Sequence, residues 1–109
     1  RVIRPLSRVN GVWVVWGRGN CLSALPTSDQ WPAKSQDGVL VSVTFNRADD
    51  GSIVVSRPSV RPTWCDKGNG YVVRSTAEQN DPTLSPAVRE QLRISEERTR
   101  EVLGEFIPA

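Results

Sequence analysis

Residues 12–16 read VWVVW, so both faces of a strand over this segment would be apolar. The preceding dipeptide Asn10-Gly11 is the strongest short signal for a type I′ turn, because both central residues of that turn need a positive φ. We therefore predict a hairpin that pairs 6–9 with 12–15. A strand that is apolar on both faces is typical of a central strand between two layers, so we expect cover on both sides of it.

A second alternating pattern predicts another hairpin. Apolar and polar residues alternate through 38–46, which indicates a half-buried strand. The segment 49–52, Asp-Asp-Gly-Ser, is a turn sequence that leads into a second strand over 53–57. Pro58 and Pro62 then flank a short segment, and we expect the prolines to confine it to the edge of a sheet.

The end of the chain changes to helical spacing. Ser85 is a suitable N-cap and Pro86 suits the first helical position. These signals predict an amphipathic helix over 85–105, docked on the sheet rather than on a partner helix because its apolar stripe is thin. The polar residues 76–84 are interpreted as a linker. The predicted class is α+β, with antiparallel, hairpin-rich sheets over 1–75 and one C-terminal helix.

Composition narrows the function. Fourteen basic and 12 acidic residues give 109 residues a net charge of +2, and the two signs are interspersed, which does not favour a nucleic-acid partner. The chain has no histidine, which removes the commonest general base and metal ligand. It has no run of 18 apolar residues. It also has no methionine and begins at Arg1, so we expect it to be a piece of a longer precursor.

Few residues offer chemistry of their own. The segment 17–20, Gly-Arg-Gly-Asn, is neither GxGxxG nor GxxxxGK, so a structural turn is favoured over an anion site. Five aspartates have no base or nucleophile at a spacing that specifies a reaction, which disfavours a small intact enzyme; they are Asp29, Asp37, Asp49, Asp50 and Asp66. Cys21 and Cys65 are not a CxxC pair, and form either one disulfide or two buried thiols.

Two longer stretches resemble a known family. RVIRPLSRVNGVWVVWGRGNCLS, followed by DGVLVSVTFNRADDGSIVVSRPSVRPTWCD, resembles the C-terminal part of the CapA, or poly-γ-glutamate capsule-synthesis, family of actinobacterial type. That family is similar to calcineurin-type metallophosphatases. The resemblance implies an α/β/β/α sandwich, with two sheets packed face to face and helices outside. It covers most of residues 1–105, and the order and spacing of the motifs carry it.

The resemblance implies that the metal centre lies mainly on the N-terminal half, which this chain lacks. Divalent metal ions are then expected in a full-length parent, where two of them can activate a water on a phosphoryl group. Arg1 stands where the family has its last histidine ligand. This chain alone is expected to hold no metal, cofactor or catalytic residue, and to hydrolyse no phosphoester.

Arg18 and Asn20 are the ligand-proximal candidates, because the resemblance places them at a strand end beside the expected site. For Asn20 the favoured alternative is a cap of its own turn. Cys21 and Cys65 replace residues that are usually aromatic or aliphatic in the family, and two such departures together suggest one disulfide. Its loop would contribute about 3–4 kcal/mol. The alternative is two buried thiols.

Two functions follow as expectations. In the first, the chain is the structural portion of a CapA-like protein of capsule biosynthesis, with the N-terminal half of the same protein as its partner. In the second, it is a non-enzymatic envelope module that binds a polyanionic capsule or wall polymer, or a protein. Both imply an extracytoplasmic, cell-surface or secreted location. If the chain folds alone, we expect a homodimer or a strand swap to hide its bare sheet face.

Overall fold

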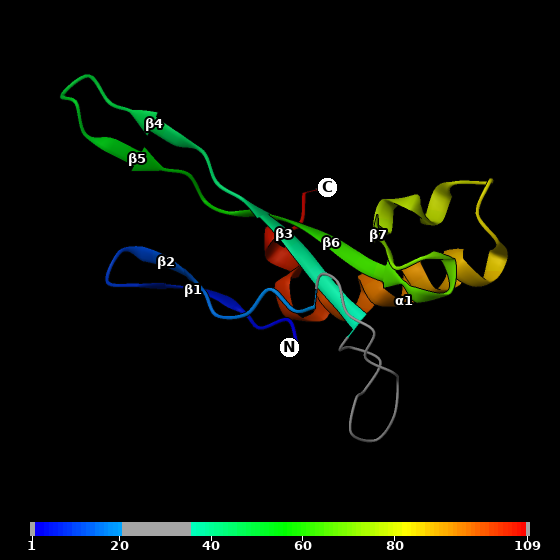
Figure 1. Ribbon diagram of the computed structural model, residues 1–109. Helices are drawn as coiled ribbons and strands as arrows, with labels where there is room; N and C mark the ends of the chain where they lie inside the picture. Colours follow the sequence, from blue (N-terminus) through cyan, green and yellow to red (C-terminus); the bar gives the residue numbers. More distant parts are fainter. Residues whose placement is uncertain (1, 21–35, 109) are drawn as a thin grey trace.

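The computed structural model describes residues 2–20 and 36–108. Its strands form three separate antiparallel groups, in the orders β1-β2, β3-β6-β7 and β4-β5, and one long helix follows them (Figure 1). The α+β class is confirmed. The elements are β1 (Leu6–Val9), β2 (Val12–Val15), β3 (Asp37–Ser42), β4 (Phe45–Arg47), β5 (Ile53–Val55), β6 (Ser59–Asp66), η2 (Lys67–Asn69), β7 (Val72–Ser75), η3 (Thr76–Asn80), α1 (Pro86–Leu103) and η4 (Gly104–Phe106).

The first hairpin forms in the predicted register. Leu6 is opposite Val15 and Val9 is opposite Val12, and both turn residues, Asn10 and Gly11, have a positive φ as the turn type requires. Among the described residues 12–16 does not form a central strand, and the covering layer that the resemblance assigns partly to the missing N-terminal half stays a prediction. In the described residues β2 pairs with β1 alone, and Val12 is 64% exposed. No layer of the described chain covers both faces of the ribbon.

The strand predicted over 38–46 is divided in two. β3 pairs with β6 as far as Ser42 opposite Ser59, and pairing resumes in the β4–β5 arm at Phe45 opposite Val55. Two residues on one side, 43–44, therefore face three on the other, 56–58, as in a β-bulge. Pro58 lies in the longer segment and has no N–H to donate to the ladder. The bulge separates the arm from the body.

The prediction that prolines confine residues 58–62 to a sheet edge is wrong. β6 is the middle strand of the three-stranded sheet, between β3 and β7, and Pro62 lies within it opposite Val39. The strand tolerates this proline because β7 pairs only with the later residues Thr63–Asp66. At Pro62, β6 pairs with β3 but not with β7. No hydrogen bond to β7 is therefore lost because proline lacks an N–H.

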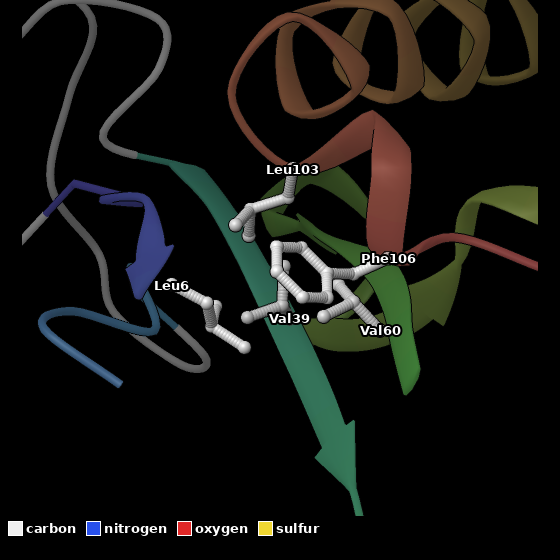
Figure 2. Close-up of a cluster of buried hydrophobic side chains, with 5 residues drawn as sticks. All are labelled: Leu6, Val39, Val60, Leu103 and Phe106. Atoms are coloured by element: carbon white, nitrogen blue, oxygen red, sulfur yellow. The ribbon is translucent and has the colours of Figure 1, made fainter. Parts of the chain in front are cut away.

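The core lies where the sheet meets the end of the helix. Its buried side chains come from β1, β3, β6, α1 and η4, and Figure 2 shows them together: Leu6, Val39, Val60, Leu103 and Phe106. The helix begins as predicted, with the Ser85 hydroxyl accepting a hydrogen bond from the Val88 amide at 3.3 Å. Its sheet-facing stripe includes two small buried polar residues, Ser95 and Thr99, which allow close approach.

The segment predicted as a linker, 76–84, begins with a short helix. Ser75 and Glu78 form a reciprocal capping box around the start of η3. Thr76 is buried, and its hydroxyl donates to the Glu96 carboxylate on α1 at 3.1 Å. The first half of the segment is thereby attached to the helix.

Candidate functional site

The segment Gly17–Asn20 attaches the β1–β2 hairpin to the sheet. The Arg4 amide donates to the Gly17 carbonyl at 3.0 Å, and the Val39 amide donates to the Arg18 carbonyl at 3.1 Å. The Asn20 amide donates in turn to the Asp37 carbonyl at 2.8 Å. These bonds commit the segment's backbone to β3 and the N-terminal residues. The preference for a structural role over a phosphate cradle agrees with this arrangement.

The structure separates the two ligand-proximal candidates. Arg18 is exposed and borders a groove, whereas Asn20 is only 8% exposed and its backbone pairs with Asp37. In a regular strand, side chains two positions apart, such as those of Arg18 and Asn20, point to the same side. An irregular residue between them removes this relation. Gly19, with φ of +75°, interrupts that regularity. Arg18 is thus the candidate that a ligand could reach.

The groove runs between the β1–β2 hairpin and the β4–β5 arm, and has a volume of about 820 Å³. Its charged lining residues are Arg8 and Arg18, with no carboxylate among them. The other walls are largely apolar and exposed, notably Val12, Val15, Val43, Phe45, Ile53 and Val55. Figure 1 shows both hairpins extending from the same side of the body. An apolar cleft with a few polar groups is the usual form of a binding site.

A stack of arginine and aromatic side chains holds the β1–β2 hairpin against the end of the helix. The rings of Trp13 and Phe106 meet edge to face with centroids 5.7 Å apart. The Arg57 guanidinium lies 4.4 Å from the Phe106 centroid and 5.6 Å from that of Trp13, and Arg8 lies 5.5 Å from Trp13. Arg57 also contacts the Glu105 carboxylate at 3.2 Å. The stack fixes one wall of the groove.

Asp37 joins the sheet to the helix. Its carboxylate is 2% exposed and accepts two hydrogen bonds from Arg98, each at 2.7 Å, and one from the Ser95 hydroxyl at 2.6 Å. The bond to Asp37 raises the pKa of Arg98, and this outweighs the desolvation that lowers it. The sequence shows no partner for Asp37 at a spacing that specifies a reaction. The residues around Asp37 give no indication that its partners, Ser95 and Arg98, lie on a distant helix.

Asp66 is held in a similar way. Its carboxylate, 2% exposed, accepts hydrogen bonds from Arg74 at 3.0 Å and from Asn69 at 2.9 Å. Arg74 also binds Glu78 at 3.2 Å. The hydrogen bond to Asp66 is the largest cause of the raised pKa of Arg74. Asp37 and Asp66 therefore bind arginines within the fold, an arrangement that suits structural ion pairs better than acid–base chemistry.

The tip of the β4–β5 arm is acidic. Asp49 and Asp50 are both exposed there. The Ser52 hydroxyl and amide donate to Asp50 at 2.6 and 2.9 Å, and the hydroxyl bond is the main reason that the pKa of Asp50 lies below its ordinary value. Asp50 is thus ionised at neutral pH, and its side chain also stabilises the turn.

The described residues bear on the metal ligands and the cysteines only in part of the chain. Within residues 2–20 and 36–108 no three of His, Cys, Asp and Glu gather where they could hold a metal ion. Cys65 is buried and forms no disulfide with any described residue. Cys21 and Arg1 lie outside the described residues, so the Cys21–Cys65 bridge and the lost histidine position stay predictions. In the same part of the chain, no helix combines the length and apolar character needed to cross a bilayer.

Sequence and structure comparisons do not extend this picture. The chain matches no protein-family model, no curated protein and no solved structure.

Proposed function

We propose that this chain is the C-terminal, sheet-forming portion of a CapA-like cell-surface protein, and that its role is structural. The N-terminal half of the same protein would supply the metal ligands and any phosphoesterase activity. This chain would supply strands against which that half packs. The proposal places the protein outside the cytoplasm, at the cell surface or secreted.

The observation that carries the proposal is uncovered apolar surface. Fourteen large hydrophobic residues are exposed among the described residues, and seven of them border the groove. A contiguous exposed apolar patch marks an interaction site. Part of it lies on the three-stranded sheet. Val39 and Val60 are in the core that packs on the helix, so the alternate positions Leu40, Arg61 and Val73 lie on the opposite face.

That opposite face carries two exposed apolar side chains, Leu40 at 57% and Val73 at 38%, beside the buried Thr63 and Cys65, so only part of it is open. A two-layer sandwich requires a second layer on such a face. We expect the N-terminal half to provide it. The family resemblance implies a two-sheet sandwich, and the exposed side chains on the sheet face are consistent with a missing second layer. Both support the proposal.

The test compares the 109-residue chain with its full-length parent. In the isolated chain Leu40→Asp should change the free energy of unfolding by less than about 0.5 kcal/mol, because the side chain is exposed. In the parent it should cost about 2 kcal/mol or more, because a carboxylate would be buried between layers. Urea unfolding measures both. Val102→Asp on α1 is the matched control and should cost the same in both proteins.

Activity gives a second readout. With Mn²⁺, the parent should hydrolyse bis(p-nitrophenyl) phosphate and the isolated chain should not. Equal effects of Leu40→Asp in the two proteins, or turnover by the isolated chain, would contradict the proposal.

A second candidate function is a non-enzymatic module that binds a polyanionic capsule or wall polymer. The observation that favours it is the groove's charge, with Arg8 and Arg18 present and no carboxylate among the lining residues. It predicts salt-sensitive binding of poly-γ-glutamate and no turnover by the parent. Loss of that binding in Arg8→Gln/Arg18→Gln would support this candidate over the first.

A further inference from the structure

The β4–β5 arm lacks the support that a two-stranded ribbon needs. All six of its strand residues are exposed, including Phe45 at 66% and Ile53 at 53%. In the described chain the two strands pair only with each other, and Figure 1 shows them projecting from the body. A lone hairpin is marginally stable in water, so an apolar arm of this kind calls for an occupant of the groove beside it.

The chain itself has the chemistry that would fill the groove. The groove offers apolar walls and the guanidiniums of Arg8 and Arg18. The arm offers the apolar side chains of Phe45 and of β5, and its tip carries the carboxylates of Asp49 and Asp50, which outnumber the one nearby cation, Arg47 of β4. Arg18 lies at the base of the groove, since its neighbour Gly19 bridges to Gly38 of the sheet, whereas Asp49 lies at the far tip of the arm. If the arms of two copies run antiparallel, the tip of one arm lies beside the base of the other copy's groove.

We propose that two copies of this chain form a twofold dimer in which the β4–β5 arm of each lies in the groove of the other. Asp49 of one copy then faces Arg18 of the other, and the same contact recurs across the axis, as an isologous interface requires. This dimer uses the groove, not the sheet face assigned to the N-terminal half, so it does not depend on the CapA-like assignment.

The lining of the groove is mainly apolar. Seven exposed apolar residues border the groove: Val12, Val15, Val43, Phe45, Ile53, Val54 and Val55. In a twofold dimer each copy would bring this apolar lining against the other, as a self-complementary interface requires.

Other occupants fit less well. An acyl chain would leave the open strand edges of both hairpins without hydrogen-bond partners, whereas a second ribbon can pair with them. A polyanion would meet an apolar wall along most of the groove. A second copy satisfies the apolar surface, the strand edges and the charges together.

The experiment is sedimentation velocity over a wide concentration range, under reducing conditions so that no intermolecular disulfide forms. The wild type should dimerise reversibly. Arg18→Glu and Asp49→Lys should each weaken dimerisation by about tenfold or more, because each places like charges opposite one another. An equimolar mixture of the two variants should restore a heterodimer. Asp50 is left unchanged because it holds the turn.

Matched controls reverse exposed charges elsewhere. Neither Arg61 of β6 nor Glu101 of α1 borders the groove. The variants Arg61→Glu and Glu101→Lys should therefore dimerise as the wild type does. Circular dichroism establishes that each variant is folded. If either charge reversal unfolds the chain, Arg18→Gln and Asp49→Asn replace them, with a smaller weakening expected for each.

A wild type that stays monomeric at every concentration would overturn the proposal. So would a dimer that ignores both charge reversals, or two variants that fail to complement when mixed. The Leu40→Asp comparison of chain and parent is unaffected by any of these results, so failure of the dimer and failure of the proposed function are distinguishable.

Discussion

Gly19 is the residue at which the chain least tolerates a side chain. A Cβ there would lie 2.3 Å from the Asp37 carbonyl oxygen and 2.8 Å from Ile3 Cγ1, and φ is +75°. The backbone bonds that join the hairpin to the sheet flank this position. We predict that Gly19→Ala lowers the free energy of unfolding by about 2–4 kcal/mol, measured in urea, because both the strain and the clash must be relieved by moving β3.

Gly51 provides the control for Gly19. It has a φ of +87°, but no atom lies within 4 Å of a Cβ built there. Gly51→Ala therefore isolates the conformational strain, which is about 1–2 kcal/mol for a residue forced into the left-handed region. If the two variants lost equal stability, close approach to β3 would not explain the glycine at 19.

Arg57 is the central contact between two elements, the β1–β2 hairpin and the end of the helix. Its guanidinium lies against the rings of Trp13 and Phe106 and also meets Glu105. We predict that Arg57→Gln costs about 1 kcal/mol, because an exposed cation–π contact contributes about 0.5–1 kcal/mol and Arg57 lies against two rings. The indole N–H resonance of Trp13 should shift in the same variant as the hairpin loosens.

Glu105→Gln separates the stacking of Arg57 from its ion pair. The side chains of Arg57 and Glu105 are 54% and 71% exposed, and exposed pairs contribute about 0–1 kcal/mol. Glu105→Gln should therefore cost less than about 0.5 kcal/mol and leave the Trp13 resonance in place. A loss as large as that of Arg57→Gln would assign the contact to the ion pair instead.

At the scale of elements, the turn sequences correctly predicted the two hairpins, because a tight turn fixes the register of its strands. Asn10-Gly11 set the first hairpin's register, and the Asp-Gly turn at 50–51 set the second. Pro62 was misplaced because its tolerance depends on where β7 stops pairing, which is fixed far along the chain. The break between β3 and β4 likewise depends on Pro58 across the ribbon, and no residue in 38–46 signals it.

The candidate site was less predictable for the same reason. The Gly-rich turn identified Arg18, which does border the groove, but the groove exists only because two hairpins that are distant in sequence extend side by side. Asn20 was grouped with Arg18 by proximity in the chain, and the left-handed Gly19 between them separates their environments. The pairing of Asp37 with Arg98 spans 61 positions, which no spacing rule reaches.

For the whole molecule, the contact between Asp37 and Arg98 fastens the helix to the sheet. Removing one member of a buried pair usually costs about 3–5 kcal/mol, because the other is left buried and unpaired. The Arg98 side chain is 26% exposed, so water would partly compensate its charge. We therefore predict that Asp37→Ala lowers the free energy of unfolding in urea by about 2–4 kcal/mol. Ser95 would also lose the acceptor for its buried hydroxyl.

The double variant Asp37→Ala/Arg98→Met decides whether the pair itself or the orphaned charge sets this cost. Replacing both charges should recover at least half of the loss, since an apolar side chain needs no partner. The pKa of Arg98 is raised in the fold, so its contribution is fully present below the ordinary pKa of arginine. The cost of Asp37→Ala should therefore stay constant from neutral to mildly alkaline pH. A double variant as unstable as the single one would show that Asp37 acts through Ser95 and the strand rather than through Arg98.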